Sequence, residues 1–416
     1  MLTVNVLQEP GGGAVLGFKC WRMQYHKRHR TYSSFSAASM YSVSILAAWD
    51  WLSVRAASHR AAEKPTVLFI KMDGIGDEVI WSTTLATLDQ LFPGTEYRRV
   101  LIGDVRWAEL LTETDPFDEK IFIENRRFAA NPLYRMRVLR RVAEVGAQIA
   151  INFRITRRFF WEDAVVRASG AGDRIGFAGT DNLMSPAQER MSARWYTRLI
   201  PEPDASLHEL EIHEYFLKQL GAGGGRAHLP AAPLRGDHTI IFLGSADPGK
   251  RWPIARLAAL ATELNAGGHD ITFCGGPNEI VAARELLERL HFVPRDLVGK
   301  TSLAELKELL STARLVITND TGAGHISTLA RIPTVVITPG HHVGRFFPYP
   351  EQIQRSYGLK QISLTGKVPC LNCGWFCTNP KRVPGEAKPC IDQISVDDAL
   401  GAIEQLLGGG SAEIRT

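Results

Sequence analysis

A glycine-containing turn between residues 71 and 77 carries two acids. The apolar run 66–70 is followed by Lys-Met-Asp-Gly-Ile-Gly-Asp, which places Asp73 and Asp77 on either side of Gly76. A dinucleotide-binding turn needs a third glycine so that a pyrophosphate can approach the backbone. That glycine is missing, and the Asp77 carboxylate would repel a pyrophosphate. A carboxylate at a strand end suits a general base instead.

This turn has a simpler alternative interpretation, in which Asp77 only caps the helix that follows. An acid at a helix N-terminus is also favoured by the helix dipole, whatever its chemical role. We expect Asp73 and Gly76 to contact substrate beside Asp77.

A second turn, GSADPGKRWP (244–253), combines small residues with a lysine. It follows the strand-like run 238–243 and precedes a helix that Pro253 can open. Ser245, Lys250 and the loop amides suit anionic oxygens such as those of a phosphate. The alternative is an ordinary polar loop with a surface lysine.

A third segment, TNDTGAGHISTLA (318–330), joins a strand to a helix. Its glycines let the backbone approach a ligand, and the helix start favours a phosphate. Asp320 can accept hydrogen bonds from sugar hydroxyls, while His325 either reaches the ligand or is a satisfied helix residue. The candidate contacts in this segment are Asp320, Thr321, Gly322, Gly324 and, in the first of these two alternatives, His325.

Four of the six cysteines cluster near the C-terminus with the spacing C-x2-C-x3-C-x12-C. They are Cys370, Cys373, Cys377 and Cys390. Four thiolates with a close C-x2-C pair suit tetrahedral zinc or iron. We expect the metal to be structural because four protein ligands leave no open position. The alternative is a group of reduced, buried thiols without metal.

Strands and helices alternate from residue 66 onwards, which predicts parallel sheets covered by helices. Predicted strands are 66–71, 97–102, 119–123, 147–153, 238–243, 270–274, 295–298, 314–318 and 333–337. Predicted helices are 78–92, 206–220, 253–266, 278–290, 302–311 and 322–331. The loop 221–233 is the best domain boundary, so two Rossmann-like halves in tandem are expected, with ligand at the carboxyl ends of their strands.

Bulk composition excludes several classes of protein. The chain has 416 residues, 45% of them apolar and 22% charged, as in soluble globular proteins of two domains. A net charge of +4 does not indicate nucleic-acid binding. Neither an apolar run of about 18 residues nor a secretory signal is apparent, so we expect a cytoplasmic protein.

Two basic regions indicate contact with an anionic surface. Residues 42–60 predict a helix with Trp49 and Leu52 on one face, which either packs on the next domain or lies in a membrane interface. Nine arginines lie between 125 and 158. We expect about half of them to be solvated, and the rest to meet phosphates or carboxylates of an anionic glycolipid.

These motifs together resemble glycosyltransferase family 9, the ADP-heptose:lipopolysaccharide heptosyltransferases and their relatives. The resemblance extends from about Thr66 to about Leu407. The segments that carry it are the 71–77 turn, LFPGTE (91–96), GKRWP (249–253), the block 296–337 and CIDQIS (390–395).

The resemblance implies a GT-B architecture of two Rossmann-like domains facing a central cleft. We expect a partly disordered N-terminal extension (1–64) with one amphipathic helix, an acceptor-binding domain (65–234) and a nucleotide-sugar-binding domain (235–416). The activity implied is inverting transfer from ADP-heptose, without a catalytic cofactor. The acceptor would be lipopolysaccharide core or another envelope molecule, met at the inner face of the cytoplasmic membrane.

The family's motifs also assign roles to residues of this chain. The catalytic base matches Asp77, and the phosphate-binding hydroxyl-plus-lysine loop matches Ser245 and Lys250. The D-T-G-x-x-H motif, which contacts sugar and phosphate, matches residues 320–325. Two departures are Ala246, where many relatives have a second hydroxyl, and the segment 338–350 with His341, His342 and Arg345.

Three other functions remain open from the sequence. Some members of the family modify proteins and bind iron through a cysteine group, so a protein heptosyltransferase with a four-cysteine metal site is one alternative. A sugar-nucleotide epimerase can also be built from two Rossmann halves. The third alternative is a non-catalytic scaffold that binds a nucleotide sugar or a metal.

Overall fold

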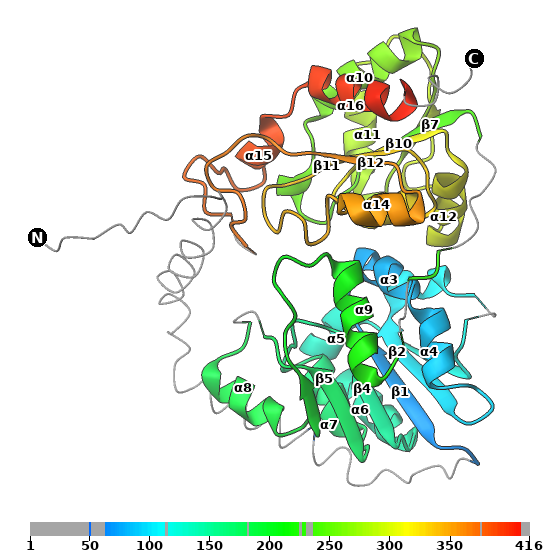
Figure 1. Cartoon of the computed structure of the whole chain (residues 1–416). Helices are drawn as coiled ribbons and strands as arrows, with labels where there is room; N and C mark the ends of the chain where they lie inside the picture. The colour runs from blue at the N-terminus through cyan, green and yellow to red at the C-terminus, as the bar shows by residue number, and fades with distance from the viewer. Residues whose placement is uncertain are drawn as a thin grey trace, which may run out of the picture. The chain divides into compact units, whose positions relative to one another are not determined.

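The computed structural model describes residues 50, 63–112, 115–180, 183–223, 227–229, 236–374 and 377–408. The chain divides into two compact units, Met1–Ala56 and Ala57–Thr416. Both sheets belong to the second unit (Figure 1). Of the expected extension (1–64), only Asp50, Glu63 and Lys64 are among the described residues, so the amphipathic helix expected over 42–60 lies outside them apart from Asp50.

The first sheet is parallel and has the strand order β3-β2-β1-β4-β5-β6. Its strands are β1 (Thr66–Lys71), β2 (Arg98–Asp104), β3 (Glu119–Ile123), β4 (Ile149–Asn152), β5 (Asp173–Phe177) and β6 (Arg198–Ile200). Every residue of β1 is buried, as expected for a central strand covered on both faces.

The second sheet is also parallel and has the order β12-β11-β10-β7-β8-β9. Its strands are β7 (His238–Phe242), β8 (Asp270–Cys274), β9 (Arg295–Asp296), β10 (Leu315–Asn319), β11 (Thr334–Ile337) and β12 (Gln361–Leu364). When the strands of each sheet are numbered from one in chain order, both sheets have the doubly wound order 3-2-1-4-5-6. The second sheet is given above from its opposite edge. The strand order reverses between β1 and β4 and between β7 and β10, where such sheets bind ligands.

Helices connect the strands of both sheets (Figure 1). Those of the first half are α3 (Ile75–Ser82), α4 (Leu85–Leu91), α5 (Asn125–Ala130), α6 (Pro132–Glu144), α7 (Glu162–Ala168), α8 (Pro186–Ala193) and α9 (Glu209–Leu220), with the 3-10 helix η2 (Val105–Leu110). Those of the second half are α10 (Ile254–Ala266), α11 (Ile280–Leu287), α12 (Leu303–Thr312), α13 (Gly322–Leu329), α14 (Glu351–Tyr357), α15 (Pro389–Asp392) and α16 (Val396–Gly408), with η3 (Pro248–Lys250) and η4 (Pro277–Glu279). Within the described ranges, every helix is too short or too polar to cross a membrane.

The nine predicted strands are present with small shifts of their ends, but the sequence missed β5, β6 and β12. These strands are short, and β5 begins with the polar pair Asp173-Arg174. The single helix predicted over 78–92 is wrong, because α3 and α4 are separate. The hydroxyls of Thr83 and Thr84 donate to the carbonyls of Ile80 and Trp81, both at 2.7 Å, where α3 ends.

Candidate functional site

Asp77 lies in the first turn of α3, directly beyond the carboxyl end of β1. It occupies the third helical position, and its Oδ2 accepts a hydrogen bond of 3.3 Å from the Gly74 amide. Gly74, not Asp77, is the N-cap residue. The Asp77 side chain thus helps to close the helix start, while the residue stays partly exposed beside the strand end.

The electrostatic surroundings of Asp77 favour a proton acceptor. Burial raises the pKa of Asp77 above its ordinary value of 3.8. The Lys71 ammonium and the Arg345 guanidinium lower that pKa, and the Glu209 carboxylate raises it further, so that the net shift is upward. A carboxylate with a raised pKa takes a proton more readily than an ordinary one, which suits general-base chemistry.

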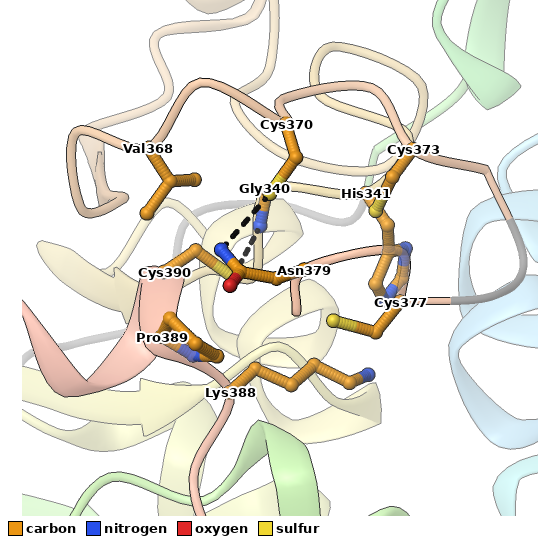
Figure 2. A pocket seen from close by; sticks show the side chains of 10 residues that line it. All are labelled: Gly340, His341, Val368, Cys370, Cys373, Cys377, Asn379, Lys388, Pro389 and Cys390. Atoms are coloured by element: carbon orange, nitrogen blue, oxygen red, sulfur yellow. Dashed lines mark hydrogen bonds between the residues drawn. The ribbon is translucent and has the colours of Figure 1, made fainter. Parts of the chain in front are cut away.

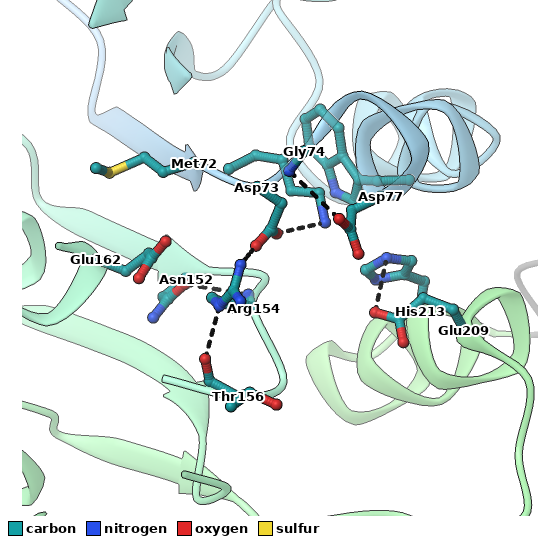
Figure 3. Close-up of polar contacts among 12 residues, drawn as sticks. Met72, Asp73, Gly74, Asp77, Asn152, Arg154, Thr156, Glu162, Glu209 and His213 are labelled. Atoms are coloured by element: carbon teal, nitrogen blue, oxygen red, sulfur yellow. Dashed lines mark hydrogen bonds and ion pairs between the residues drawn. The ribbon is translucent and has the colours of Figure 1, made fainter. Parts of the chain in front are cut away.

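Asp73 lies in a buried ion-pair network below the turn (Figure 3). Its carboxylate pairs with Lys71 Nζ at 2.8 Å and with the Arg154 guanidinium. Arg154 Nε also donates to the Thr156 carbonyl at 2.7 Å, and Trp107 Nε1 donates to the Asp73 carbonyl at 3.3 Å. Asp73 therefore helps to hold the turn that carries Asp77, and the substrate contact expected for it stays a prediction.

Lys250, in the loop 244–253, forms an ion pair with Asp320, in the segment 318–330. Lys250 Nζ lies 2.9 Å from Asp320 Oδ2, which joins the loop after β7 to the end of β10. Burial is the largest single influence on the pKa of Asp320 and raises it, but the charge and hydrogen bond of Lys250, together with His325 and His341, outweigh burial, so that the pKa is lowered. Asp320 is therefore an ionised acceptor at neutral pH, placed at the point where the strand order reverses.

Asn319 fixes the loop after β7 from the neighbouring strand. Its side-chain amide donates to the Leu243 carbonyl at 2.9 Å, and its Oδ1 accepts from the Trp252 amide at 2.9 Å. Ser245 is buried in this loop, and its carbonyl accepts two hydrogen bonds from Arg251, at 2.8 and 3.0 Å. Ser245 and Lys250, singled out from the sequence, thus lie in one loop anchored to β10.

Helix α13 begins at Gly322 and lies against the turn of Asp77. A methyl group at Gly322 would stand 2.6 Å from Ile75 Cγ2, and one at Gly76 would stand 2.9 Å from His325 Cδ2. Only glycine permits this approach of α3 to α13. The structure therefore brings the sequence-predicted residues Gly76, Gly322 and His325 together.

His325 is a buried and hydrogen-bonded helix residue. Its ring stacks on Phe347 with centroids 4.2 Å apart, and its Nδ1 lies 3.0 Å from the Tyr349 hydroxyl. Burial lowers the pKa of His325 to about 3, so that the ring is neutral at ordinary pH. Of the two alternatives left open by the sequence, this geometry fits the satisfied helix residue. Ligand contact by His325 stays a prediction.

Most of the arginines between 125 and 158 are already paired. Six of the nine form ion pairs with acids, and the pair of Arg157 with Asp163 is fully buried. Arg135 donates to the Phe160 carbonyl at 2.7 Å. The positive charge available to a glycolipid in this region is consequently smaller than the sequence count suggests.

The four clustered cysteines line one pocket together with Lys388, His341 and Asn379 (Figure 2). Burial raises the pKa of Cys373, and the other three thiols add to this shift. In the described part of the chain, no three or more His, Cys, Asp or Glu side chains are arranged as a metal site. The donor set suits zinc or iron, but it does not close around one point, and the metal stays a prediction.

Sequence reasoning missed two residues that face Asp77 from other elements. Glu209 is the first residue of α9 and is buried, while Arg345 follows β11 in the second half. Arg345 Nε donates to Glu209 Oε2 at 3.1 Å, and the Glu209 amide donates to the Arg345 carbonyl at 2.8 Å. In the sequence, Arg345 stands out only as part of a departure from the family pattern, and Glu209 only as an acid near a predicted helix start, which usually indicates a cap.

Known proteins similar to this chain point to one family. Residues 203–363 match the family model described as glycosyltransferase family 9 (heptosyltransferase). Lipopolysaccharide core heptosyltransferase OpsX of Haemophilus influenzae is 30% identical over 179 residues, which cover 40% of this chain and 47% of that protein. Lipopolysaccharide heptosyltransferase 1 of Pseudomonas aeruginosa is 23% identical over 324 residues, which cover 74% of this chain and 85% of that protein. The match thus spans about half the length of the first relative and most of the second.

Solved structures extend the similarity to the fold. E. coli heptosyltransferase WaaC with ADP-2-deoxy-2-fluoro heptose has a TM-score of 0.59 at 20% sequence identity, over 82% of this chain and 99% of that one. With the two doubly wound sheets, this likeness confirms the GT-B fold class expected from the sequence.

Proposed function

We propose that this chain, whose residues 203–363 match the model of glycosyltransferase family 9, is a member of that family and moves a heptose from an ADP-activated donor to an acceptor hydroxyl, with inversion at the anomeric carbon. The proposed acceptor is lipopolysaccharide core or another molecule of the cell envelope. The similar proteins that act as lipopolysaccharide heptosyltransferases support this class of acceptor, and the ADP-sugar bound to WaaC supports the donor.

One observation carries the proposal: the turn of Asp77 lies directly against the helix that begins at Gly322. The close approach of Gly76 to His325 and of Ile75 to Gly322 supports the proposal, because Asp77, the proposed proton acceptor, then lies near a helix N-terminus of the kind that suits a phosphate. An acceptor hydroxyl near Asp77 and a diphosphate near Gly322 would therefore flank the same anomeric carbon.

In the proposed reaction, the Asp77 carboxylate takes the proton of the acceptor hydroxyl. The hydroxyl oxygen forms a bond to the anomeric carbon, while the bond from that carbon to the diphosphate oxygen breaks. The electron pair leaves with the diphosphate, and attack from the opposite face inverts the configuration. The raised pKa of Asp77 fits its role as the base.

The leaving diphosphate gains negative charge as its bond to the sugar breaks. Lys250, the Ser245 hydroxyl and the amides at the start of α13 are the groups proposed to stabilise that charge. Asp320, held by Lys250 at 2.9 Å, accepts hydrogen bonds from hydroxyls of the donor sugar. Thr321 and Gly324 complete the proposed donor contacts around the helix start.

Zinc or iron, if bound, would be held by Cys370, Cys373, Cys377 and Cys390 and would cross-link the C-terminal segment. No step of the proposed reaction uses it. The thiol cluster is also the observation that favours a second acceptor class, a protein side chain.

For the glycolipid acceptor, we propose a cytoplasmic enzyme that works at the inner surface of the membrane.

The direct test is transfer by purified protein from ADP-heptose, compared with GDP- and UDP-sugars, to a lipopolysaccharide-core acceptor and to a protein acceptor. Asp77→Asn should lower the rate by about 10²–10⁴-fold, the usual contribution of a general base. Its ADP affinity, measured by calorimetry, should stay near that of the wild type.

The matched control is Asp173→Asn, which changes an exposed acid at the start of β5 and should keep full activity. Near wild-type turnover in Asp77→Asn would reduce Asp77 to a residue that closes the helix start. Turnover with the GDP- or UDP-sugars but not ADP-heptose would overturn the proposed donor.

A further inference from the structure

We propose that Lys388, in the cysteine-rich segment, is a positioning residue for the donor loop 244–251. The proposal rests on the donor site proposed above, but the order of the loop can be measured without any donor. Lys388 lies 11 residues after Cys377 and two before Cys390, in a region where the sequence indicates only a metal site.

Lys388 contacts the donor loop through both its side chain and its backbone. Its Nζ lies 2.6 Å from Asp247 Oδ2, and its amide donates to the Gly249 carbonyl at 3.0 Å. Only 11% of the Lys388 side chain is exposed. The lysine is therefore packed against the loop and is not a free surface cation.

These contacts act on the short turn that presents Lys250. Asp247 Oδ1 accepts from the Gly249 amide and the Asp247 carbonyl accepts from the Lys250 amide, both at 2.9 Å. A methyl group at Gly249 would stand 3.1 Å from Lys388 Cε, so the lysine stem fills the side of the turn. Lys388 thereby holds Asp247, Asp247 holds the turn, and the turn directs Lys250 towards Asp320.

The cysteine-rich segment in turn holds Lys388 in place. Cys390 Sγ accepts a hydrogen bond from the Gly340 amide at 3.2 Å, and the Cys390 carbonyl accepts one from the Gly366 amide at 2.7 Å. Figure 2 shows Lys388 at the rim of the pocket that the four cysteines line. The cysteine-rich segment (370–390) thus supports the donor loop (244–251) through Lys388.

A competing interpretation is that Lys388 itself contacts a donor phosphate. The two roles make different predictions for Asp247. If Lys388 acts through Asp247, removing either partner should loosen the loop, and removing both should do no further harm. If Lys388 binds phosphate directly, Asp247→Asn should leave affinity unchanged or improve it, because a competing negative charge is lost.

The experiment uses the full chain with Lys388→Met, Lys388→Arg, Asp247→Asn and the Lys388→Met/Asp247→Asn double variant. Lys381→Met, an exposed lysine of the same segment, is the matched control. Amide hydrogen exchange of residues 246–251 is measured without ligand, ADP affinity by calorimetry, and kcat and KM with ADP-heptose.

We expect Lys388→Met to speed exchange at the Gly249 and Lys250 amides. If the ordered loop falls to about a tenth of the population, ADP affinity and KM should worsen about tenfold with little change in kcat. Lys388→Arg should restore most of the affinity, Asp247→Asn should resemble Lys388→Met, and the double variant should be no worse than either.

Unchanged exchange in Lys388→Met would overturn the proposal, as would a loss of affinity that Asp247→Asn does not share. Should Lys388→Met fail to fold, Asp247→Asn carries the test, since it removes the same ion pair from the other side. A wild-type protein that does not bind ADP would contradict the proposed donor, while the exchange data would still decide the role of Lys388.

Discussion

Gly76 lies directly against the ring of His325, so that a methyl group added at Gly76 would stand 2.9 Å from His325 Cδ2. The His325 ring cannot easily move away, because it stacks on Phe347 and is hydrogen-bonded to the Tyr349 hydroxyl. The turn that carries the proposed base therefore keeps a set spacing from the helix proposed to hold the diphosphate.

Gly76→Ala should disturb this spacing and lower the transfer rate. A displacement of about 1 Å between reacting groups can cost on the order of 100-fold in rate. The measurement is kcat together with ADP affinity, which should change less than kcat. Gly401→Ala, at a helical glycine with open space around it, is the control. Full activity in Gly76→Ala would show that the contact is not needed.

The pH dependence of transfer should report the surroundings of Asp77. Activity should fall as the pH drops through the pKa of Asp77, which burial raises above 3.8. Glu209→Gln removes a charge that raises this pKa, so the acidic limb of kcat/KM should move to lower pH. Arg345→Gln removes a charge that lowers it, so the limb should move to higher pH. Shifts in the same direction, or none, would exclude Asp77 as the titrating base.

Lys250→Ala should weaken ADP binding, since a positive charge near the proposed diphosphate is lost. It should also destabilise the fold at neutral pH by leaving Asp320 without its partner. The lowered pKa of Asp320 means that the pair stabilises the protein above about pH 3.8 and that this contribution is lost as the pH falls through the folded-state pKa. Calorimetry, together with Tm at pH 7 and at pH values below 3.8, tests both points, with the exposed Lys300→Ala as control.

Purified protein should contain about one zinc or iron per chain by elemental analysis, as for a four-thiolate site. Cys390→Ser should lose the metal, whereas Cys274→Ser, at a buried thiol of β8, should keep it. A stable, metal-free protein with four titratable thiols in the 370–390 segment would end this prediction.

Glu78, next to Asp77 in α3, should make stability depend on pH. Burial raises the pKa of Glu78 from 4.5 to about 8, although Lys307 and Lys71 oppose the shift. Because the folded-state pKa is the higher one, stability should fall as the pH rises from about 4.5 to about 8. Glu78→Gln should flatten this dependence of Tm, and the exposed Glu96→Gln should not. Parallel Tm curves for wild type and Glu78→Gln would refute the assignment.

The sequence by itself determined the alternation of strands and helices, the turn that carries Asp77 and the clustering of the cysteines. These features are local: a buried parallel strand is a continuous apolar run, and a ligand-binding turn is a short string of glycines and polar residues. The points at which helices end are predicted less well, because they depend on interactions that the apolar pattern does not contain. Thr83 and Thr84 end α3 through side-chain hydrogen bonds that the apolar pattern over 78–92 does not reveal.

Only the tertiary structure decided which charges meet. Arg345 pairs with Glu209 across 136 residues of chain, and Lys388 pairs with Asp247 across 141. Arg154, which the sequence places in a general basic region, is an ion-pair partner of the buried Asp73. Crossover connections bring distant strand ends to one edge of each sheet, and burial there makes every charge depend on its neighbours. The spacing of residues along the chain does not predict which side chains become those neighbours.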